Sequence, residues 1–315
     1  MLTLVVVPLD GSAFGEQALP TALRIAEREH AELELVHVFE RIPPYRVQGA
    51  PPLDPTLDAD LRKESASYLD SVAGWLRGKA SVPVTATLLD GRVAETLDAH
   101  IAERHADLVV MTTHGRGGLS RLWLGSVAAE VVRGSRAPVL LIRPDESGSR
   151  DMPSTPFGRV LVPLDTSPES EEAVDHAMAI AGDPGVRYLL LHVIQEVLYI
   201  MDPIAAAYPD EAELRESAER YLGTVAERMR SRGFAVETRV VRHAQPARAI
   251  LDAADEFRAD LVALETHGHG PRAALLVGSV ADKVVRGAHA PVLVHRPMER
   301  AETSAQGETG ERRTG

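Results

Sequence analysis

The sequence predicts an α/β protein with two tandem doubly wound domains, each a five-stranded parallel sheet flanked by helices. The strongest observation is an internal repeat: Val-Pro-Leu-Asp at 7–10 returns at 162–165, and His37-Val38 returns at 192–193. A repeat of this length is a duplicated globular domain, because solenoid units run at only about 20–50 residues. Each half also alternates strand-like and helix-like segments, and its strands are continuous apolar runs. Such runs are typical of strands buried on both faces of a parallel sheet.

The first half supplies the elements in order. A helix is expected from about 13 to 28, and strands are expected at 4–9, 33–39, 82–89, 108–112 and 139–142. The helix before the third strand is clearest in the second half, where apolar residues keep helical spacing. These residues are Leu214, Ala218, Tyr221, Leu222, Val225 and Met229. Ser167-Pro168 predicts a helix start, with a serine cap and a proline at the first helical position.

Composition divides the chain and limits its chemistry. We expect domains at 1–144 and 158–298, a Pro/Ser/Gly-rich linker at 145–157, and a disordered tail at 299–315. No cysteine is present, which excludes disulfides and thiol catalysis. The net charge of −12 argues against nonspecific nucleic-acid binding. With no apolar run of about 18 residues and no basic, cleavable leader, the sequence predicts a cytoplasmic protein without a membrane span.

Unusual residues follow the first and fourth strands of each half, where ligands of doubly wound sheets bind. Asp10-Gly11-Ser12 follows the first strand, and a glycine-rich loop from Gly115 to Gly125-Ser126 follows the fourth. Glycines let backbone amides approach an oxyanion, a helix start adds unpaired donors, and Arg116 could supply counter-charge. The glycines could equally be tight turns, and the aspartate could simply cap a helix.

Other polar residues give weaker signals. His37 and its counterpart His192 resemble packed core histidines, and His267 with His269 lacks the acidic or thiolate partner that a metal site needs. No metal site is therefore expected. Neither the Walker nor the Rossmann glycine motif is present, and no nucleophile has a paired base. The residues indicate that the protein holds a ligand and is not an enzyme, although slow incidental hydrolysis of that ligand is compatible with them.

Taken together, these motifs resemble the universal stress protein family in its tandem form. The resemblance rests on Val-Pro-Leu-Asp, His-Val, Thr-His-Gly-Arg-Gly-Gly-Leu-Ser-Arg, Leu-Gly-Ser-Val-Ala and Ala-Pro-Val-Leu-Leu-Ile-Arg, in that order. It covers nearly the whole chain outside the linker and tail. One branch of the family binds ATP through Gly, two residues, Gly, nine residues, and Gly-Ser/Thr. The resemblance implies ATP as ligand, with or without Mg²⁺.

Carried over by position, the resemblance implies nucleotide contacts in both halves. The acidic residue lies near the ribose or base, the valine and the fourth-strand residue near adenine, and the glycine–serine segment near phosphate. In the first half these are Asp10, Val38, Met111, Gly115, Arg116, Gly125, Ser126 and Val127. In the second half they are Asp165, Val193, Leu264, Gly268, Gly278, Ser279 and Val280.

The halves depart from the family pattern at its first glycine. Thr112 takes that place in the first half and Glu265 in the second. A carboxylate near a triphosphate adds repulsion, so we expect the first site to bind ATP more tightly. The leading hypothesis is a cytoplasmic, nucleotide-dependent regulatory module of the stress response. The alternatives are an interaction scaffold of the same fold that binds no nucleotide, and an adenylating or hydrolysing enzyme of the same fold.

The last strand of each half predicts assembly. Each is short, apolar and introduced by Ala-Pro, at 137–138 and 290–291, which suits an edge strand. A bare apolar edge invites pairing. We therefore expect the halves to form an intramolecular pseudo-dimer along these edges, and whole chains to form a homodimer. The protein partner stays open.

Overall fold

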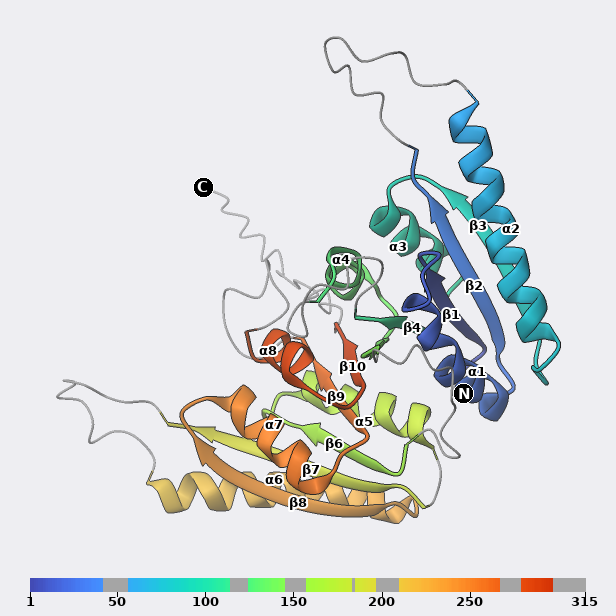
Figure 1. Ribbon diagram of the computed structural model, residues 1–315. Helices are drawn as coiled ribbons and strands as arrows, with labels where there is room; N and C mark the ends of the chain where they lie inside the picture. The colour runs from blue at the N-terminus through green and yellow to red at the C-terminus, as the bar shows by residue number, and fades with distance from the viewer. Residues whose placement is uncertain are drawn as a thin grey trace, which may run out of the picture.

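The computed structural model describes residues 1–41, 56–113, 124–144, 157–182, 185–196, 210–266 and 279–296. Within these residues the strands form one sheet in the order β3-β2-β1-β4-β5-β10-β9-β6-β7-β8 (Figure 1). The strands of the first half are β1 (Leu4–Leu9), β2 (Glu32–Phe39), β3 (Val84–Asp90), β4 (Leu108–Thr112) and β5 (Val139–Ile142). Those of the second half are β6 (Arg159–Pro163), β7 (Arg187–Gln195), β8 (Ala235–His243), β9 (Leu261–Glu265) and β10 (Val292–His295).

Each half has five strands in the same relative order, and every strand pair within a half is parallel. The expected fold class is therefore confirmed. The helices of the first half are the 3-10 helix η1 (Gly15–Ala18), α1 (Leu19–Glu29), α2 (Leu57–Arg77), α3 (Val93–Glu103) and α4 (Ser126–Gly134). Those of the second half are α5 (Pro168–Ala181), α6 (Glu211–Ser231), α7 (Pro246–Phe257) and α8 (Ser279–Gly287).

Two apolar cores lie on the two faces of the sheet. One core includes buried residues of α1, α2, α5 and α6, and the other includes those of α3, α4, α7 and α8. Successive strand residues alternate between the cores, as in β4, where Leu108 and Val110 join the first core and Val109 and Met111 the second. Each core runs through both halves, so the duplicated domains share their hydrophobic interior. In Figure 1, α2 and α6 lie at the outer ends of the sheet beside β3 and β8.

The halves meet through β5 and β10, which pair antiparallel with Leu140 opposite Leu293. Two matched arginines also reach across this junction: Arg143 donates to the carbonyl of Ala288 at 2.9 Å, and Arg296 donates to that of Arg133 at 2.6 Å. The expected pairing along these edges is confirmed. The pairing occupies both apolar edges, so the homodimer of whole chains needs another surface and stays a prediction.

The first helix of each half begins differently. Ser167 caps α5 as expected, its hydroxyl accepting from the amide of Ser170 at 3.1 Å. In the first half the expected helix is divided into η1 and α1, with Pro20 at the start of α1. Proline has no amide to donate, which explains why the regular helix begins there and not earlier.

Two further expectations concern the chain as a whole. Phe157, at the end of the expected linker, is buried in the first core, at 3% exposed. The tail and the rest of the linker lie outside the described residues. None of the helices in the described part of the chain combines the length and apolar character that a membrane crossing requires.

Candidate functional site

The strand order reverses between β1 and β4 in the first half, and between β6 and β9 in the second. From β1 the chain proceeds to β2 and β3 on one side, and then crosses to β4 on the other. Connections therefore leave the carboxyl ends of β1 and β4 in opposite directions, and proteins of this architecture bind their ligands outside such strand ends. The segments at these ends are the ones that the sequence singled out.

The aspartate after the first strand builds a tight turn in each half. The Oδ1 atom of Asp10 accepts from the amide of Ser12 at 3.0 Å and from its hydroxyl at 2.6 Å. The Oδ1 atom of Asp165 accepts from the same two groups of Ser167. Between them, Gly11 and Thr166 have φ values of 82° and 73°, a left-handed conformation that suits glycine better than threonine. These bonds give both aspartates a structural role, and their contact with a ligand stays a prediction.

The end of β4 is tied to the start of α4. The amide of Gly125 donates to the carbonyl of Thr113 at 2.8 Å, which closes the intervening loop at its base. The first helical hydrogen bond runs from the amide of Ala129 to the carbonyl of Gly125 at 2.9 Å. The amides of the first turn, beginning at Ser126, therefore have no acceptor within the helix and form the positive end of its dipole. An oxyanion is the ligand that this arrangement suits.

The remaining predicted residues are distributed around these strand ends. In the second half Ser279 begins α8, matching Ser126. Val38, Met111 and Leu264 are all buried in the second core, which also contains the buried residues of α4 and α8. Val127, Val193 and Val280 are partly buried against this core. The predicted residues Gly115, Arg116, Gly268 and Gly278 lie outside the described residues.

The paired histidines link the first two strands of each half. The Nδ1 atom of His37 lies 2.7 Å from the carbonyl oxygen of Leu9, and that of His192 lies 2.8 Å from the carbonyl oxygen of Leu164. Because a carbonyl can only accept, each Nδ1 carries the proton and donates it. This contact fixes the ends of β1 and β6 against their neighbours. His37 is buried as expected of a core histidine, whereas His192 is only partly buried.

The side chain of Glu265 does not lie where the sequence analysis expects it. Leu261 and Ala263 face the core beneath α5, and Glu265 continues that alternation, with its side chain only 1% exposed. Its Oε2 atom lies 3.0 Å from Nδ1 of His295. Burial raises the pKa of Glu265 to about 7, although the His295 hydrogen bond opposes this effect. The expected repulsion between Glu265 and a triphosphate requires a charged carboxylate beside the nucleotide. Glu265 instead points into the core, so this repulsion no longer distinguishes the two sites.

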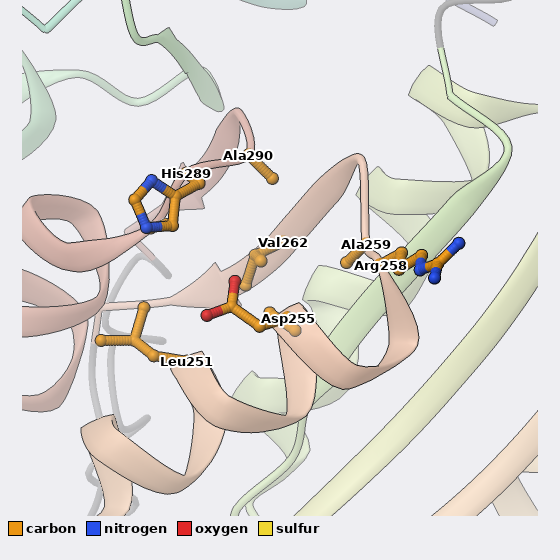
Figure 2. Close-up of a pocket in the computed structure, with 9 residues that line it drawn as sticks. Leu251, Asp255, Arg258, Ala259, Val262, His289 and Ala290 are labelled. Atoms are coloured by element: carbon orange, nitrogen blue, oxygen red, sulfur yellow. The ribbon is translucent and has the colours of Figure 1, made fainter.

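A small pocket lies elsewhere on the second half (Figure 2). Its volume is about 130 Å³, and its wall is formed by the end of α7, the start of β9 and the segment before β10. Asp255 and His289 border this space, whereas the Arg258 side chain is turned away from it (Figure 2). Val262 is the second residue of β9, so the pocket opens at the amino ends of the strands. It contains none of the predicted site residues, and it lies at the wrong edge for a ligand of this fold.

The fold and its matched strand ends define a tandem α/β protein of the doubly wound class. The universal stress protein family matches the chain twice, over residues 1–143 and 156–296. The chain is 32% identical over 302 residues to a universal stress protein of Mycolicibacterium smegmatis, covering 93% of this chain and 97% of that protein. This chain therefore belongs to the universal stress protein family and contains the family domain twice.

Two further proteins are similar to one half of the chain and to nearly the whole chain, respectively. A universal stress protein of Thermus aquaticus is 37% identical over 145 residues, which are 45% of this chain and 100% of that protein. It is thus similar in length to one half. The crystal structure of a universal stress protein from Archaeoglobus fulgidus superposes with a TM-score of 0.65 at 21% identity, covering 94% of this chain and 97% of that chain. At that identity the similarity shows the fold.

Proposed function

We propose that this protein binds ATP at the carboxyl edge of its first half and acts as a cytoplasmic, nucleotide-dependent regulatory module of the stress response. The observation that carries the proposal is the hydrogen bond from Gly125 to Thr113, which sets the open first turn of α4 at the end of β4. This places oxyanion donors at the point where the strand order reverses. The motif spacing in the sequence supports a nucleotide as the source of the oxyanion.

The residues around this point have the chemistry that each part of ATP requires. Ser126 and the following amides would hold phosphate oxygens, and the apolar surface at Val38 and Met111 would receive the base. Asp10, whose Oδ1 atom builds the turn, would approach the ribose. Mg²⁺, when bound, would balance phosphate charge. The chain's own contribution is to orient the phosphates, and we assign it no catalytic residue.

The first half is favoured over the second by the helix start. The first turn of α4 contains no acidic residue, whereas that of α8 contains Asp282. Arg286 binds this carboxylate at 2.8 Å, so its repulsion of a phosphate is reduced and not removed. We therefore attribute the expected difference in ATP affinity between the two sites to Asp282, and not to the buried Glu265.

A glycine substitution tests the proposal. Gly125 has φ −58° and ψ 152°, values that any residue adopts, so Gly125→Val adds bulk without backbone strain. We expect calorimetry to show about one tight ATP site per intact chain, and this variant to lose it. Ser126→Ala removes one hydrogen bond and should weaken binding by about 0.5–1.5 kcal/mol. Ser279→Ala is the matched control, which should leave the tight site unchanged. Unaltered ATP affinity in Gly125→Val would contradict the proposal.

Asp10 and Asp165 both accept hydrogen bonds within their own turns, and this observation favours a second candidate function. In that function the protein is an interaction scaffold that binds no nucleotide. In that case the glycines and aspartates only shape the loops. Mass spectrometry of the supernatant after denaturation of the purified protein separates the two, because a nucleotide-binding protein releases adenine nucleotide. The scaffold is supported if no nucleotide is released and none binds on titration.

A further inference from the structure

Outside the candidate nucleotide site, three side chains of the second half converge beneath the start of α5. Glu172, His176 and His295 each offer a ligand atom within 4.8 Å of the others. Glu172 and His176 are one turn apart on α5 and so lie on the same face of that helix. His295 ends β10. Its Nδ1 atom is 3.8 Å from Oε2 of Glu172, and its ring centre is 4.4 Å from that of His176.

Glu265 forms the floor of this cluster, which we call the His–Glu cluster. It pairs with His295 in the β9–β10 register, and one oxygen contacts the His295 ring. Its other oxygen, Oε1, is buried and has no hydrogen-bond partner in the described part of the chain. A buried carboxylate oxygen without a partner is unfavourable unless something compensates it. Glu172, by contrast, is 44% exposed and leaves the cluster open on one side.

The charges of the cluster also suit a cation. A divalent cation between the carboxylates of Glu172 and Glu265 and the two imidazoles gives a site with no net charge.

We propose that Glu172, His176 and His295 bind a divalent transition metal of the zinc class, and that Glu265 orients the His295 ring. Two imidazoles and a carboxylate are a donor set that zinc uses when one coordination position stays open. Donor atoms around tetrahedral zinc lie about 3.4 Å apart, given metal–ligand distances of about 2.1 Å. The donor atoms of the cluster lie within 4.8 Å of one another, so metal binding draws the three side chains closer together. A carboxylate bound to the ring of a ligating histidine is the usual outer partner of such a ligand. Because Nδ1 of His295 contacts Glu265, Nε2 is the nitrogen that this arrangement leaves for the metal.

The first half provides an internal comparison. Thr112 and Ile142 form the strand pair that matches Glu265 and His295. By the displacement of the first repeat motif, Gln17 and Thr21 take the places of Glu172 and His176. The repeated fold therefore does not require ionisable groups at these positions. The second half contains four of them together, and a shared ligand is the simplest physical reason.

The test is a titration of the intact, metal-free chain with Zn²⁺ and separately with Mg²⁺, followed by calorimetry and thermal unfolding. We expect one Zn²⁺ per chain and a higher melting temperature, because a ligand that binds only the folded state stabilises it. Mg²⁺ prefers oxygen donors and should not bind this cluster. Co²⁺ in place of Zn²⁺ should give the visible absorption bands of a coordinated site.

Matched variants assign the site. His176→Thr and His295→Ile copy the first half and should each weaken Zn²⁺ binding by about 100-fold or more, whereas Glu265→Gln should weaken it about 10–100-fold. His289→Ala, at the opposite edge of the sheet, is the histidine control, and the double variant His267→Ala/His269→Ala tests the other histidines. The proposal is overturned if the parent binds no Zn²⁺ at micromolar concentration. It is also overturned if His176→Thr and His295→Ile bind it as the parent does, or if only the His267/His269 variant loses it.

Discussion

The two halves of this molecule share the side chains that hydrogen-bond to the backbone, and they differ in the side chains that pack at several other matched positions. Asp107 accepts from the amides of Thr3 and Leu4, and Asp260 accepts from those of Gly158 and Arg159. The Asp–Ser turns and the histidine contacts are repeated in the same way. Groups that satisfy backbone donors are retained because an unpaired buried amide is costly.

The side chains that face a helix from the sheet, or pack between helices, have diverged instead. The first half has uncharged Thr112 where the second has Glu265. Where α3 packs on α4, and α7 on α8, the acid is in the first half instead: Asp98 of the first half matches Leu251 of the second. Each half thus has an acid at a packed position where the other half has an uncharged residue. Duplication preserved the fold and left such positions to take on separate roles.

The largest expected effect tests the symmetry of the halves at their junction. Leu140 and Leu293 lie opposite each other in the β5–β10 pair and are 0% and 1% exposed. Leu140→Ala and Leu293→Ala should each lower the free energy of unfolding by about 2–5 kcal/mol, through lost burial and the cavity left behind. Because the sites are equivalent, we expect similar losses in chemical denaturation. A loss confined to one variant would show that the junction is asymmetric.

A smaller effect is expected at the paired histidines. His37→Ala and His192→Ala remove a donor and leave the carbonyl of Leu9 or Leu164 unpaired, which costs about 1–3 kcal/mol. His37 is 7% exposed, whereas His192 is only partly buried, so the first variant should lose more stability. Denaturant unfolding of both variants measures the difference. An equal or larger loss in His192→Ala would contradict this ranking.

The smallest effect is a gain in stability and concerns Asp98. Burial, together with the charge of Glu130, raises the pKa of Asp98 from 3.8 to about 6, and its Oδ1 atom has no hydrogen-bond partner in the described residues. The folded chain therefore holds this proton after the unfolded chain has released it. As a result, Asp98 lowers stability progressively as the pH rises from about 4 to 6.

Asp98→Leu copies the second half, where Leu251 packs against Gly287 as Asp98 packs against Gly134. The side chain is half-buried, so after allowance for solvent screening we expect a gain of about 1–2 kcal/mol above pH 6. Below about pH 4 the part of the gain that comes from the charge should vanish. Asp98→Asn is the control that removes the charge and keeps the shape. Urea unfolding at pH 4 and pH 7 tests this, and a gain independent of pH would contradict it.

Most of the fold could be predicted, because the repeat and the buried strands are properties of the sequence itself. The cap at Ser167 and the pairing of the last strands also followed from local rules. The division of the first helix at Pro20 was missed, although proline is a known helix-start signal. Boundaries depend on such single residues.

The environment of Glu265 was the main error at the candidate site. A motif position assigns a residue to a place along the chain, and the face of the strand decides which neighbours it has. Alternation from Leu261 and Ala263 would have pointed Glu265 toward α5. The signal for the cluster was the spacing of Glu172 and His176, combined with His295 replacing the isoleucine of the first half. These residues are far apart in sequence, so only the strand register brings them together.

The antiparallel pairing of β5 with β10 has a consequence for communication. All strands of the first half run one way and all strands of the second half run the other. The carboxyl ends that carry the candidate ATP site and those that carry the His–Glu cluster therefore emerge at opposite rims of one continuous sheet. A single flat partner surface cannot cover both rims. The route between them crosses β4, β5, β10 and β9, about 14 Å sideways at the usual strand spacing, and also runs the length of the strands from one rim to the other.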